Sequence, residues 1–254
     1  ILTNRPVLDD IKDYFPATLE LALVSMVVTM VLGILLGILS ALQQGRLVDN
    51  VTRLFTTLWM AMPVFWFGLL LQILFYGRLG WLPPGGRISE KIIMPAKTTG
   101  MLLVDSLVAG RPDAFWSAAV HLILPVLAVA LPRVAEVARI TRSSMLEVLG
   151  QDYVRTARAK GLAERRVILR HSLKNASLPI ITTFGLQFGY LLGGTILVEA
   201  IFQWPGMGRY AVLSITSVDF PAVIGVTVVA SFAFVLVNLV IDLAYRFADP
   251  RIRY

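Results

Sequence analysis

A single long and strongly basic segment lies between Asp152 and Pro179 and reads DYVRTARAKGLAERRVILRHSLKNASLP. We predict that this segment faces the cytoplasm and is the functional part of a chain that otherwise consists mainly of apolar runs. No G-x-x-x-x-G-K-[ST] loop is present to cradle ATP phosphates, and no H-E-x-x-H or G-x-S-x-G motif is present for metal-dependent or serine hydrolysis. The residues therefore predict docking at the basic segment and no catalytic residue in the chain.

Two short helices are predicted to position this segment. Asp152 is placed to accept N–H groups at the start of the first helix, Arg158 and Lys160 lie near its end, and Gly161 terminates it with a positive φ. A helix this short is marginal in water because nucleation is costly, so it needs a docking surface. The second helix has an apolar side. That side is formed by Val167, Ile168, Leu169 and Leu173. Two such helices meeting at a glycine make an elbow.

The elbow resembles the EAA loop of permease subunits of ATP-binding-cassette (ABC) importers. RTARAKGL followed by HSLKNASLP is similar to the dipeptide, oligopeptide and nickel branch of that family. The likeness extends to TRSSMLEVLGQDYVRTARAKGL, FGLQFGYLLGGTILVEAIFQWPGMGR and NLVIDLAYRFADPRIRY, and so covers nearly the whole chain. Arg155, Thr156 and Ala157 stand where the general motif has Glu-Ala-Ala, and Leu178-Pro179 lie farther from Gly161 than the general spacing. Both departures fit this branch.

This resemblance implies an all-α membrane protein with the type I ABC importer transmembrane fold, also called MetI-like. It implies a second homologous permease subunit, identical or different, two ATP-binding subunits that hold ATP and Mg, and a periplasmic or extracellular substrate-binding protein. No cofactor or metal is expected in this chain. The coupling loop is expected at residues 150–179. Its predicted contacts with the ATPase are Asp152, Arg155, Thr156, Ala157, Arg158, Ala159, Lys160, Gly161, Leu162 and Glu164.

Composition independently places the chain in a membrane. Of its 254 residues, 57% are hydrophobic and only 15% are charged, and the mean hydropathy is +0.75. The net charge of +7 could suggest nucleic acid, but the basic residues flank apolar spans without aromatic interleaving. The absence of cysteine excludes a disulfide framework and a thiolate metal site. Composition therefore indicates a multi-pass membrane protein, and the resemblance implies that it lies in the bacterial inner membrane.

Five apolar stretches approach the 20 or so residues that a membrane-spanning helix needs. They fall near residues 17–42, 54–76, 115–141, 178–198 and 222–246. Residues 1–16 are expected to form an external segment ahead of a transmembrane domain at 17–254, and the resemblance implies a further N-terminal helix before residue 1. Gly33 and Gly37 form a small-xxx-small pair, which either allows another helix to approach closely or occurs by chance.

Basic residues predict the orientation of these spans. Residues 43–53, 142–177 and 248–254 are expected to face the cytoplasm, and the N-terminus, 77–114 and 199–221 are expected outside. A short apolar piece around Thr99 to Ala109 is too short to span. It is either a re-entrant or surface-lying segment, or it helps to shape the outer mouth at which a substrate-binding protein would dock.

Four polar residues in the spans or at the end of one are candidates for the translocation path, because polar groups within the membrane are functional candidates by default. They are Gln187, Glu199, Asn238 and Asp242. Asp242 also has a structural interpretation, in which it pairs with Arg246 or caps the bundle near the cytoplasmic end.

The predicted function is therefore that of a permease subunit without enzymatic activity. It forms half of the translocation path for peptides or related small solutes, and separate ATPase subunits drive it. Dipeptide, oligopeptide, nickel chelate, glutathione and haem all remain possible cargo. An ion-coupled secondary transporter is the alternative, which would need intramembrane ion sites in repeated halves. A membrane-embedded enzyme would need a set of polar groups at one depth.

Overall fold

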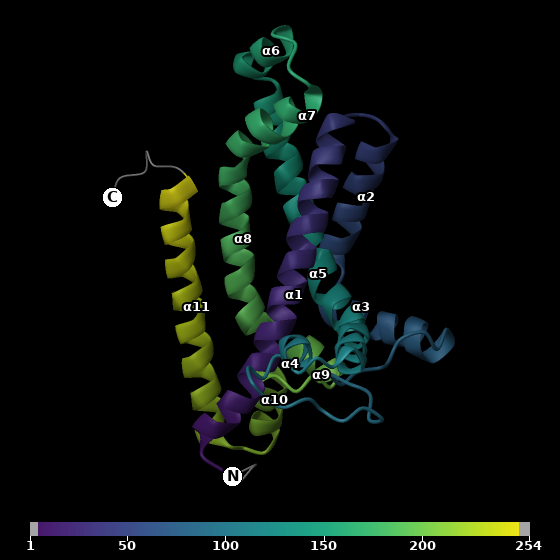
Figure 1. Ribbon diagram of the computed structural model, residues 1–254, viewed down its shortest axis with the longest axis vertical. Helices are drawn as coiled ribbons and strands as arrows, with labels where there is room; N and C mark the ends of the chain where they lie inside the picture. Colours follow the sequence, from purple (N-terminus) through teal and green to yellow (C-terminus); the bar gives the residue numbers. More distant parts are fainter. Residues whose placement is uncertain (1–4, 249–254) are drawn as a thin grey trace. The chain divides into compact units, whose positions relative to one another are not determined.

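The computed structural model describes residues 5–248, without the side chains of residues 192–194, 241–242 and 244–248. Within these residues the chain is helical and contains no strand (Figure 1). The long helices are α1 (Val7–Leu42), α5 (Pro112–Leu149), α8 (Lys174–Gly194) and α11 (Phe220–Ala248). They correspond to four of the five predicted spans, and the all-α membrane fold is confirmed.

Three helices in the described residues are long and apolar enough to cross a bilayer: α1, α5 and the Phe220–Val240 part of α11. The number becomes four if the helices on either side of Pro63 are counted as one broken span. Helix α8 has 21 residues but is not among them. Its polar residues Lys174, Asn175 and Gln187 lower its mean hydropathy.

The predicted span at 54–76 is interrupted at Pro63. Helix α2 begins earlier and ends at Ala61, and a new helix starts after Pro63. Proline lacks an N–H group and disfavours the helical conformation in the residue before it, which here is Met62. The elements on either side are α2 (Leu47–Ala61), α3 (Val64–Leu71) and the π-helix η1 (Gln72–Arg78).

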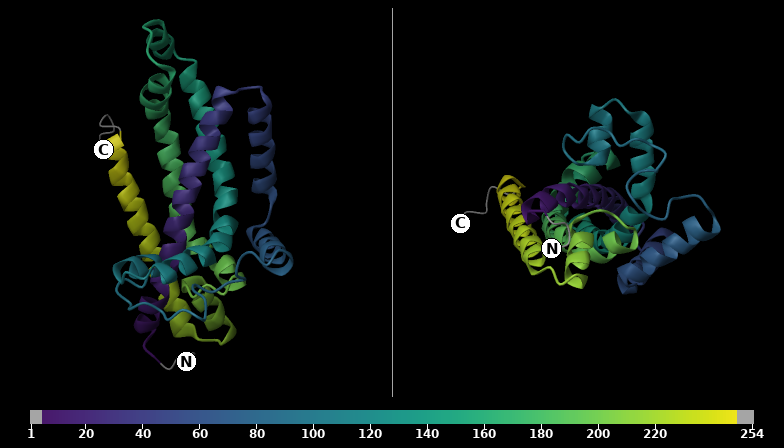
Figure 2. Two further views of the ribbon diagram at one scale, coloured as in Figure 1. Left: turned by 45° about the vertical axis from the view of Figure 1, so that its right-hand side comes forward. Right: turned by 90° about the horizontal axis from the view of Figure 1, so that it is seen from below.

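The chain divides into two compact units, and each is described separately. The first comprises residues 1–26, 62–130 and 188–236. It contains the start of α1, and its shorter helices include α3, η1, α4 (Leu102–Val108), α9 (Ile196–Ile201) and α10 (Met207–Thr216) (Figure 2). The predicted short piece at Thr99 to Ala109 is thus a two-turn helix. The predicted external, turn-rich segment at 199–221 is largely helical.

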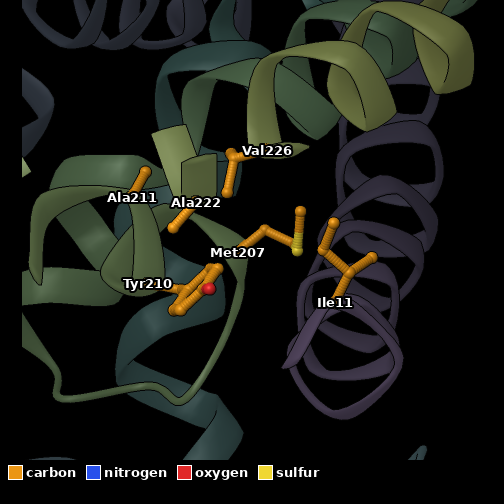
Figure 3. Close-up of a cluster of buried hydrophobic side chains, with 6 residues drawn as sticks. All are labelled: Ile11, Met207, Tyr210, Ala211, Ala222 and Val226. Carbon is orange, nitrogen blue, oxygen red and sulfur yellow. The ribbon is translucent and has the colours of Figure 1, made fainter. Parts of the chain in front are cut away.

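An apolar cluster holds α10 between α1 and α11 in this first unit (Figure 3). Tyr210 is buried there, stacks on Tyr14 with ring centroids 4.8 Å apart, and donates a hydrogen bond to Asp10 at 3.0 Å. Burial and the neighbouring carboxylate raise the pKa of Tyr210 to about 12. The other members of the cluster are Ile11, Met207, Ala211, Ala222 and Val226.

The second unit comprises residues 27–61, 131–187 and 237–254. In it, the later half of α1 lies against α5 (Figures 1 and 2). A Cβ atom on Gly33 would lie 2.7 Å from Val137, and one on Gly37 would lie 2.5 Å from Thr141. Only glycine permits helices this close. The interpretation of Gly33 and Gly37 as a close helix contact is confirmed.

Candidate coupling site

The first helix of the elbow is α6 (Asp152–Ala159), which forms as predicted. Its predicted cap is wrong, because Asp152 is the first helical residue and Gln151 occupies the N-cap position without a side-chain hydrogen bond. Asp152 is almost fully exposed and lies 3.7 Å from Arg155 in a loose ion pair. Its carboxylate can still favour the helix through the macrodipole, because negative charge in the first turn is stabilising.

The C-terminal end of α6 is a Schellman turn centred on Gly161. The Leu162 N–H donates to the Ala157 carbonyl at 3.3 Å, and the Gly161 N–H donates to the Arg158 carbonyl at 2.9 Å. Gly161 has φ +74°, a conformation that side chains other than glycine and asparagine rarely adopt. The prediction of a positive φ at Gly161 is confirmed.

The docking surface that so short a helix needs is present within the chain. Val154 and Ala157 form the inner face of α6 and pack against Val167, and all three are buried. Val148 and Leu149 at the end of α5, together with Leu162, complete the cluster. Fully burying a valine side chain such as Val154 or Val167 contributes about 1.5–3 kcal/mol. The cluster therefore fixes α6 both to α5 and to the segment that follows Gly161.

The second half of the elbow differs from the predicted short helix. Helix α7 (Glu164–Arg166) runs directly into the π-helix η2 (Val167–Leu173) and then into α8. Val167 of the predicted apolar side is buried, whereas Leu169 is 48% exposed. The sequence pattern did not reveal that helical backbone continues from Glu164 to Gly194.

One ion pair spans the glycine turn from α6 to α7. The Arg158 guanidinium donates two hydrogen bonds to the Glu164 carboxylate, from Nη2 at 2.6 Å and from Nε at 3.2 Å. Arg158 lowers the pKa of Glu164, and the carboxylate raises the pKa of Arg158. Both side chains are about half exposed, so solvent and salt screen the pair.

The outward face of the elbow contains most of the predicted coupling residues. Ala157 is buried and Leu162 is half-buried, so both support the turn from within. The remaining predicted residues are exposed. They are Asp152, Arg155, Thr156, Arg158, Ala159, Lys160, Gly161 and Glu164. Figure 1 shows α6 and α7 beyond the ends of α5 and α8, where a partner can reach them. The arrangement can bind a partner with charge and shape complementarity.

The structure does not gather the predicted translocation-path residues into one site. Gln187 donates a hydrogen bond to Glu136, which links α8 to α5 in the second unit. Asn238 is half-buried on α11, and the side chain of Asp242 lies outside the described residues. Their role in a path stays a prediction.

Glu199 is fully buried in the first unit, where its carboxylate completes the start of α10. Gly208 and Arg209 donate their N–H groups to Oε2 at 2.7 and 3.2 Å. Thr18 and Thr195 donate their hydroxyls to Oε1 at 2.9 and 2.7 Å. Both carboxylate oxygens thus accept hydrogen bonds from groups of the chain itself, which favours a structural role over the predicted place in the translocation path. Burial raises the pKa of Glu199, and these hydrogen bonds oppose the effect.

Sequence reasoning missed a buried acid in the second unit. Asp49 is 1% exposed and accepts Arg142 Nε and Nη2 at 2.6 and 2.8 Å. It also accepts the Ser40 hydroxyl at 2.6 Å and the Gly45 N–H at 2.9 Å. The signal in the sequence is an aspartate two residues into a helix after a glycine turn. The described residues contain no cluster of three His, Asp or Glu side chains that could hold a metal ion.

Comparison with known proteins identifies the family. Residues 33–254 match the family model described as "Binding-protein-dependent transport system inner membrane component". The chain is 48% identical over 252 residues to "Probable D,D-dipeptide transport system permease protein DdpB" of Escherichia coli (strain K12), covering 99% of this chain and 74% of that relative. It is 43% identical to "Dipeptide transport system permease protein DppB" of Alkalihalophilus pseudofirmus (strain ATCC BAA-2126 / JCM 17055 / OF4), with 99% and 75% covered.

Two further comparisons agree with these. "Glutathione transport system permease protein GsiC" of Escherichia coli O1:K1 / APEC is 38% identical over 254 residues, covering all of this chain and 74% of that relative. The solved structure "Inward facing conformations of the MetNI methionine ABC transporter" shares the fold with a TM-score of 0.65. It is 14% identical and covers 92% of this chain and 93% of its own. The chain thus belongs to the binding-protein-dependent transport system inner membrane components, within the dipeptide branch of ABC importer permeases.

Proposed function

We propose that this chain forms half of the translocation path of an ATP-driven dipeptide importer and couples to separate ATPase subunits through the elbow. The observation that carries the coupling proposal is the geometry of α6. Its inner face is packed onto α5 and η2, and its outer face, including Arg155 and Lys160, is exposed. The names of the relatives support a dipeptide cargo.

The coupling mechanism follows from the continuity of the helices. Helix α6 is packed against the end of α5, and α7 continues through η2 into α8. A push on the exposed face of α6 is therefore delivered to two long helices at once. Closure of the ATPase subunits would move the elbow as a rigid lever, and packed helices respond by switching between discrete arrangements.

The partners in this proposal are a second homologous permease, two ATP-binding subunits and an external binding protein. They are supported by the family and by the absence of a phosphate-binding loop in this sequence. In this proposal the chain alone neither transports nor hydrolyses ATP, and the inner-membrane permease is active only within the assembly.

The test is transport by the complete importer in vesicles. Uptake of a radiolabelled dipeptide should require ATP, the ATPase subunits and loaded binding protein together. The ligand that copurifies with the binding protein should be a dipeptide, and glutathione and a nickel chelate serve as comparison cargo. Uptake that follows an imposed ion gradient without ATP would overturn the proposal.

Topology gives an independent test, because the chain contains no cysteine and single cysteines can be introduced. Ser172 lies in the loop that is predicted to be cytoplasmic, but it is buried and would label poorly. Arg165 and Trp81 are exposed. A membrane-impermeant maleimide applied to intact cells should modify a cysteine at Trp81 and leave one at Arg165 unmodified. The reverse pattern would refute the predicted orientation.

A further inference from the structure

A mainly polar cavity lies in the first unit, on the side of the chain that is predicted to be external. Its lining comes from η1, the connection that follows η1, the first turns of α5 and the end of α9. Its volume is about 890 Å³, within the range of about 300–1,000 Å³ that is typical of small-molecule sites. None of the described residues that line it belongs to the elbow or to the predicted translocation path.

Hydrogen bonds between these segments hold the walls of the cavity in place. The Gln72 Nε2 group donates to the carbonyls of Pro84 and Ile201 at 2.5 and 3.1 Å. The Gly86 N–H donates to the Phe202 carbonyl at 2.8 Å. The cavity is therefore pre-organised, which lowers the entropic cost of binding a ligand in it.

His121 lines the cavity with its ring held in one orientation. The His121 Nδ1 atom lies 2.7 Å from the Ser117 carbonyl oxygen. Because a carbonyl oxygen can only accept, Nδ1 carries the proton, and in the neutral ring Nε2 has a free lone pair. Nε2 has no hydrogen-bond partner within the described residues, and His121 is half-buried. This nitrogen can therefore accept a hydrogen bond from an N–H group of a ligand.

Two further polar side chains come from the π-helix, a conformation that is found frequently at functional sites. Gln72 and Tyr76 are separated by about one turn of η1. In the part of the chain that the structure describes, the Gln72 Oε1 atom accepts no hydrogen bond and the Tyr76 hydroxyl makes none. Both can pair with the N–H and C=O groups of a peptide bond. Gln203, which also lines the cavity, has a φ of +51°, and such strain outside glycine is concentrated at functional sites.

Two opposite charges complete the lining. Glu90 and Lys91 lie in a turn, are exposed, and form no ion pair within the described residues. A free dipeptide has the same two charges, on its terminal ammonium and carboxylate groups. Between its ends it offers one peptide bond and two side chains. The polar groups of η1 suit the peptide bond, and Pro83 and Ile88 in the lining suit apolar side chains.

We propose that this cavity binds a dipeptide with free termini on the external side of the permease. In this arrangement Glu90 lies opposite the ammonium group, Lys91 opposite the carboxylate, and His121 accepts the N–H of the peptide bond. The inference rests on the proposed function, from which it takes the cargo, and it adds a cargo site within the permease itself. A capped peptide or an internal segment of a protein has the same peptide bonds but lacks both terminal charges.

The experiment measures binding of radiolabelled alanyl-alanine to the assembled importer by equilibrium dialysis. The binding protein is left out, so that its own site does not contribute. The test variant is E90Q/K91Q, which removes one charge of each sign from the cavity. The control variant is R111Q/D113N, which removes an exposed pair of opposite charges from the same external side, outside the cavity.

Wild type and R111Q/D113N should bind the dipeptide equally. E90Q/K91Q should bind it about tenfold more weakly, as expected for two partly exposed charge contacts. Acetyl-alanyl-alanine amide, which lacks both terminal charges, should compete about tenfold less well than the free dipeptide. The assignment would be overturned by the absence of saturable binding to the wild type, by an equal loss in test and control variants, or by equal competition from the capped peptide.

A second pair of variants tests the ring nitrogen, and it decides the matter if E90Q/K91Q does not assemble. H121N keeps an N–H group near the position of Nδ1 but has no group at that of Nε2, whereas H121Q has an amide near the position of Nε2. H121N should bind the dipeptide about fivefold more weakly, as expected for one lost hydrogen bond, and H121Q should bind it like the wild type. Wild-type binding by H121N would remove His121 from the site.

Uptake by the complete importer separates this inference from the proposed function. Uptake that requires ATP and loaded binding protein, without any binding of dipeptide to the importer alone, would overturn the cavity and leave the proposed function intact. Conversely, a wild type that binds dipeptide at the cavity but shows no ATP-dependent uptake would support the cavity and refute the proposed function.

Discussion

The elbow around α6 and the outer segment around α10 are both built on a short helix, but they are stabilised in opposite ways. Helix α6 depends on its own neighbours in sequence, through the Gly161 turn and a small apolar cluster, and its charges face solvent. Helix α10 depends on buried side chains outside the helix, because Thr18, 189 residues away, and Glu199 accept hydrogen bonds from its first N–H groups. The charged groups of α6 therefore stay available to a partner, whereas the polar groups around the start of α10 are satisfied within the chain.

The largest effect is expected from Glu199→Ala, which breaks the buried connection. The N–H groups of Gly208 and Arg209 and the hydroxyls of Thr18 and Thr195 lose their acceptor. Each unsatisfied buried group costs about 1–3 kcal/mol, so the stability of the first unit should fall by about 4 kcal/mol. Thermal unfolding of the purified importer checks this. Glu199→Gln, which keeps one acceptor oxygen, should lose less than half as much, and equal losses would contradict the capping role.

The next effect is expected at the buried pair of Arg87 and Glu20, also in the first unit. Arg87 is 10% and Glu20 is 3% exposed, and Arg87 also donates to the Gly100 carbonyl at 3.0 Å. Arg87→Met leaves a buried carboxylate without its cation and should cost about 3 kcal/mol. The double variant R87M/E20Q should recover part of this loss in the same unfolding assay. Additive losses would show that the two residues act independently.

A smaller change in stability but a large change in transport is expected from Gly161→Val. A Cβ at this position meets no atom within 4 Å, so the cost comes only from the positive φ and amounts to about 1–2 kcal/mol. Uptake and ATPase stimulation by loaded binding protein should fall at least about tenfold in an assembled importer. Gly161→Asn is the control, because asparagine tolerates this conformation, and it should transport normally. Wild-type transport by Gly161→Val with ATPase bound would refute the lever.

Glu164→Gln should have a modest effect, since the pair with Arg158 is half exposed and is worth at most about 0.5 kcal/mol. The pKa of Glu164 is lowered in the folded chain. Its contribution is therefore present above the unfolded pKa and is lost as pH falls through the folded value. ATPase stimulation by loaded binding protein, measured as a ratio of wild type to Glu164→Gln, should approach one at acidic pH. A ratio of wild type to Glu164→Gln that grows as the pH falls would contradict the pH dependence expected from the lowered pKa of Glu164.

The smallest effect is expected from Asp152→Ala. Because Asp152 makes no capping hydrogen bond and its side chain is 96% exposed, only its macrodipole contribution of about 0.3–1 kcal/mol is lost, and the thermal midpoint should fall only slightly. Arg155→Ala provides the comparison on the same face. A transport defect in either variant with nearly unchanged stability would identify a direct contact with the ATPase. A clear loss of stability in Asp152→Ala would instead restore its predicted role as a cap.

The sequence alone determined the features that depend on neighbouring residues. Gly161 follows two cations at a helix end, which is enough to predict its positive φ, and apolar runs of about 20 residues predict the long helices. The small-residue spacing of Gly33 and Gly37 correctly indicated a close helix contact. Pro63 is also present in the sequence. Whether it ends a helix or only kinks it depends on whether neighbouring helices satisfy the backbone groups that it leaves unpaired, and the sequence pattern does not show this.

Tertiary structure decided the partners of the buried polar groups. Glu199 and Thr18 are 181 residues apart, and Asp49 and Arg142 are 93 apart. No feature of the local sequence distinguishes these buried side chains from residues that line a translocation path. For this reason the sequence predicts that Glu199 lies in such a path. A buried carboxylate must find donors wherever the fold supplies them, so its role follows from packing. Likewise, only the structure shows that Gln151, and not Asp152, occupies the N-cap position of α6.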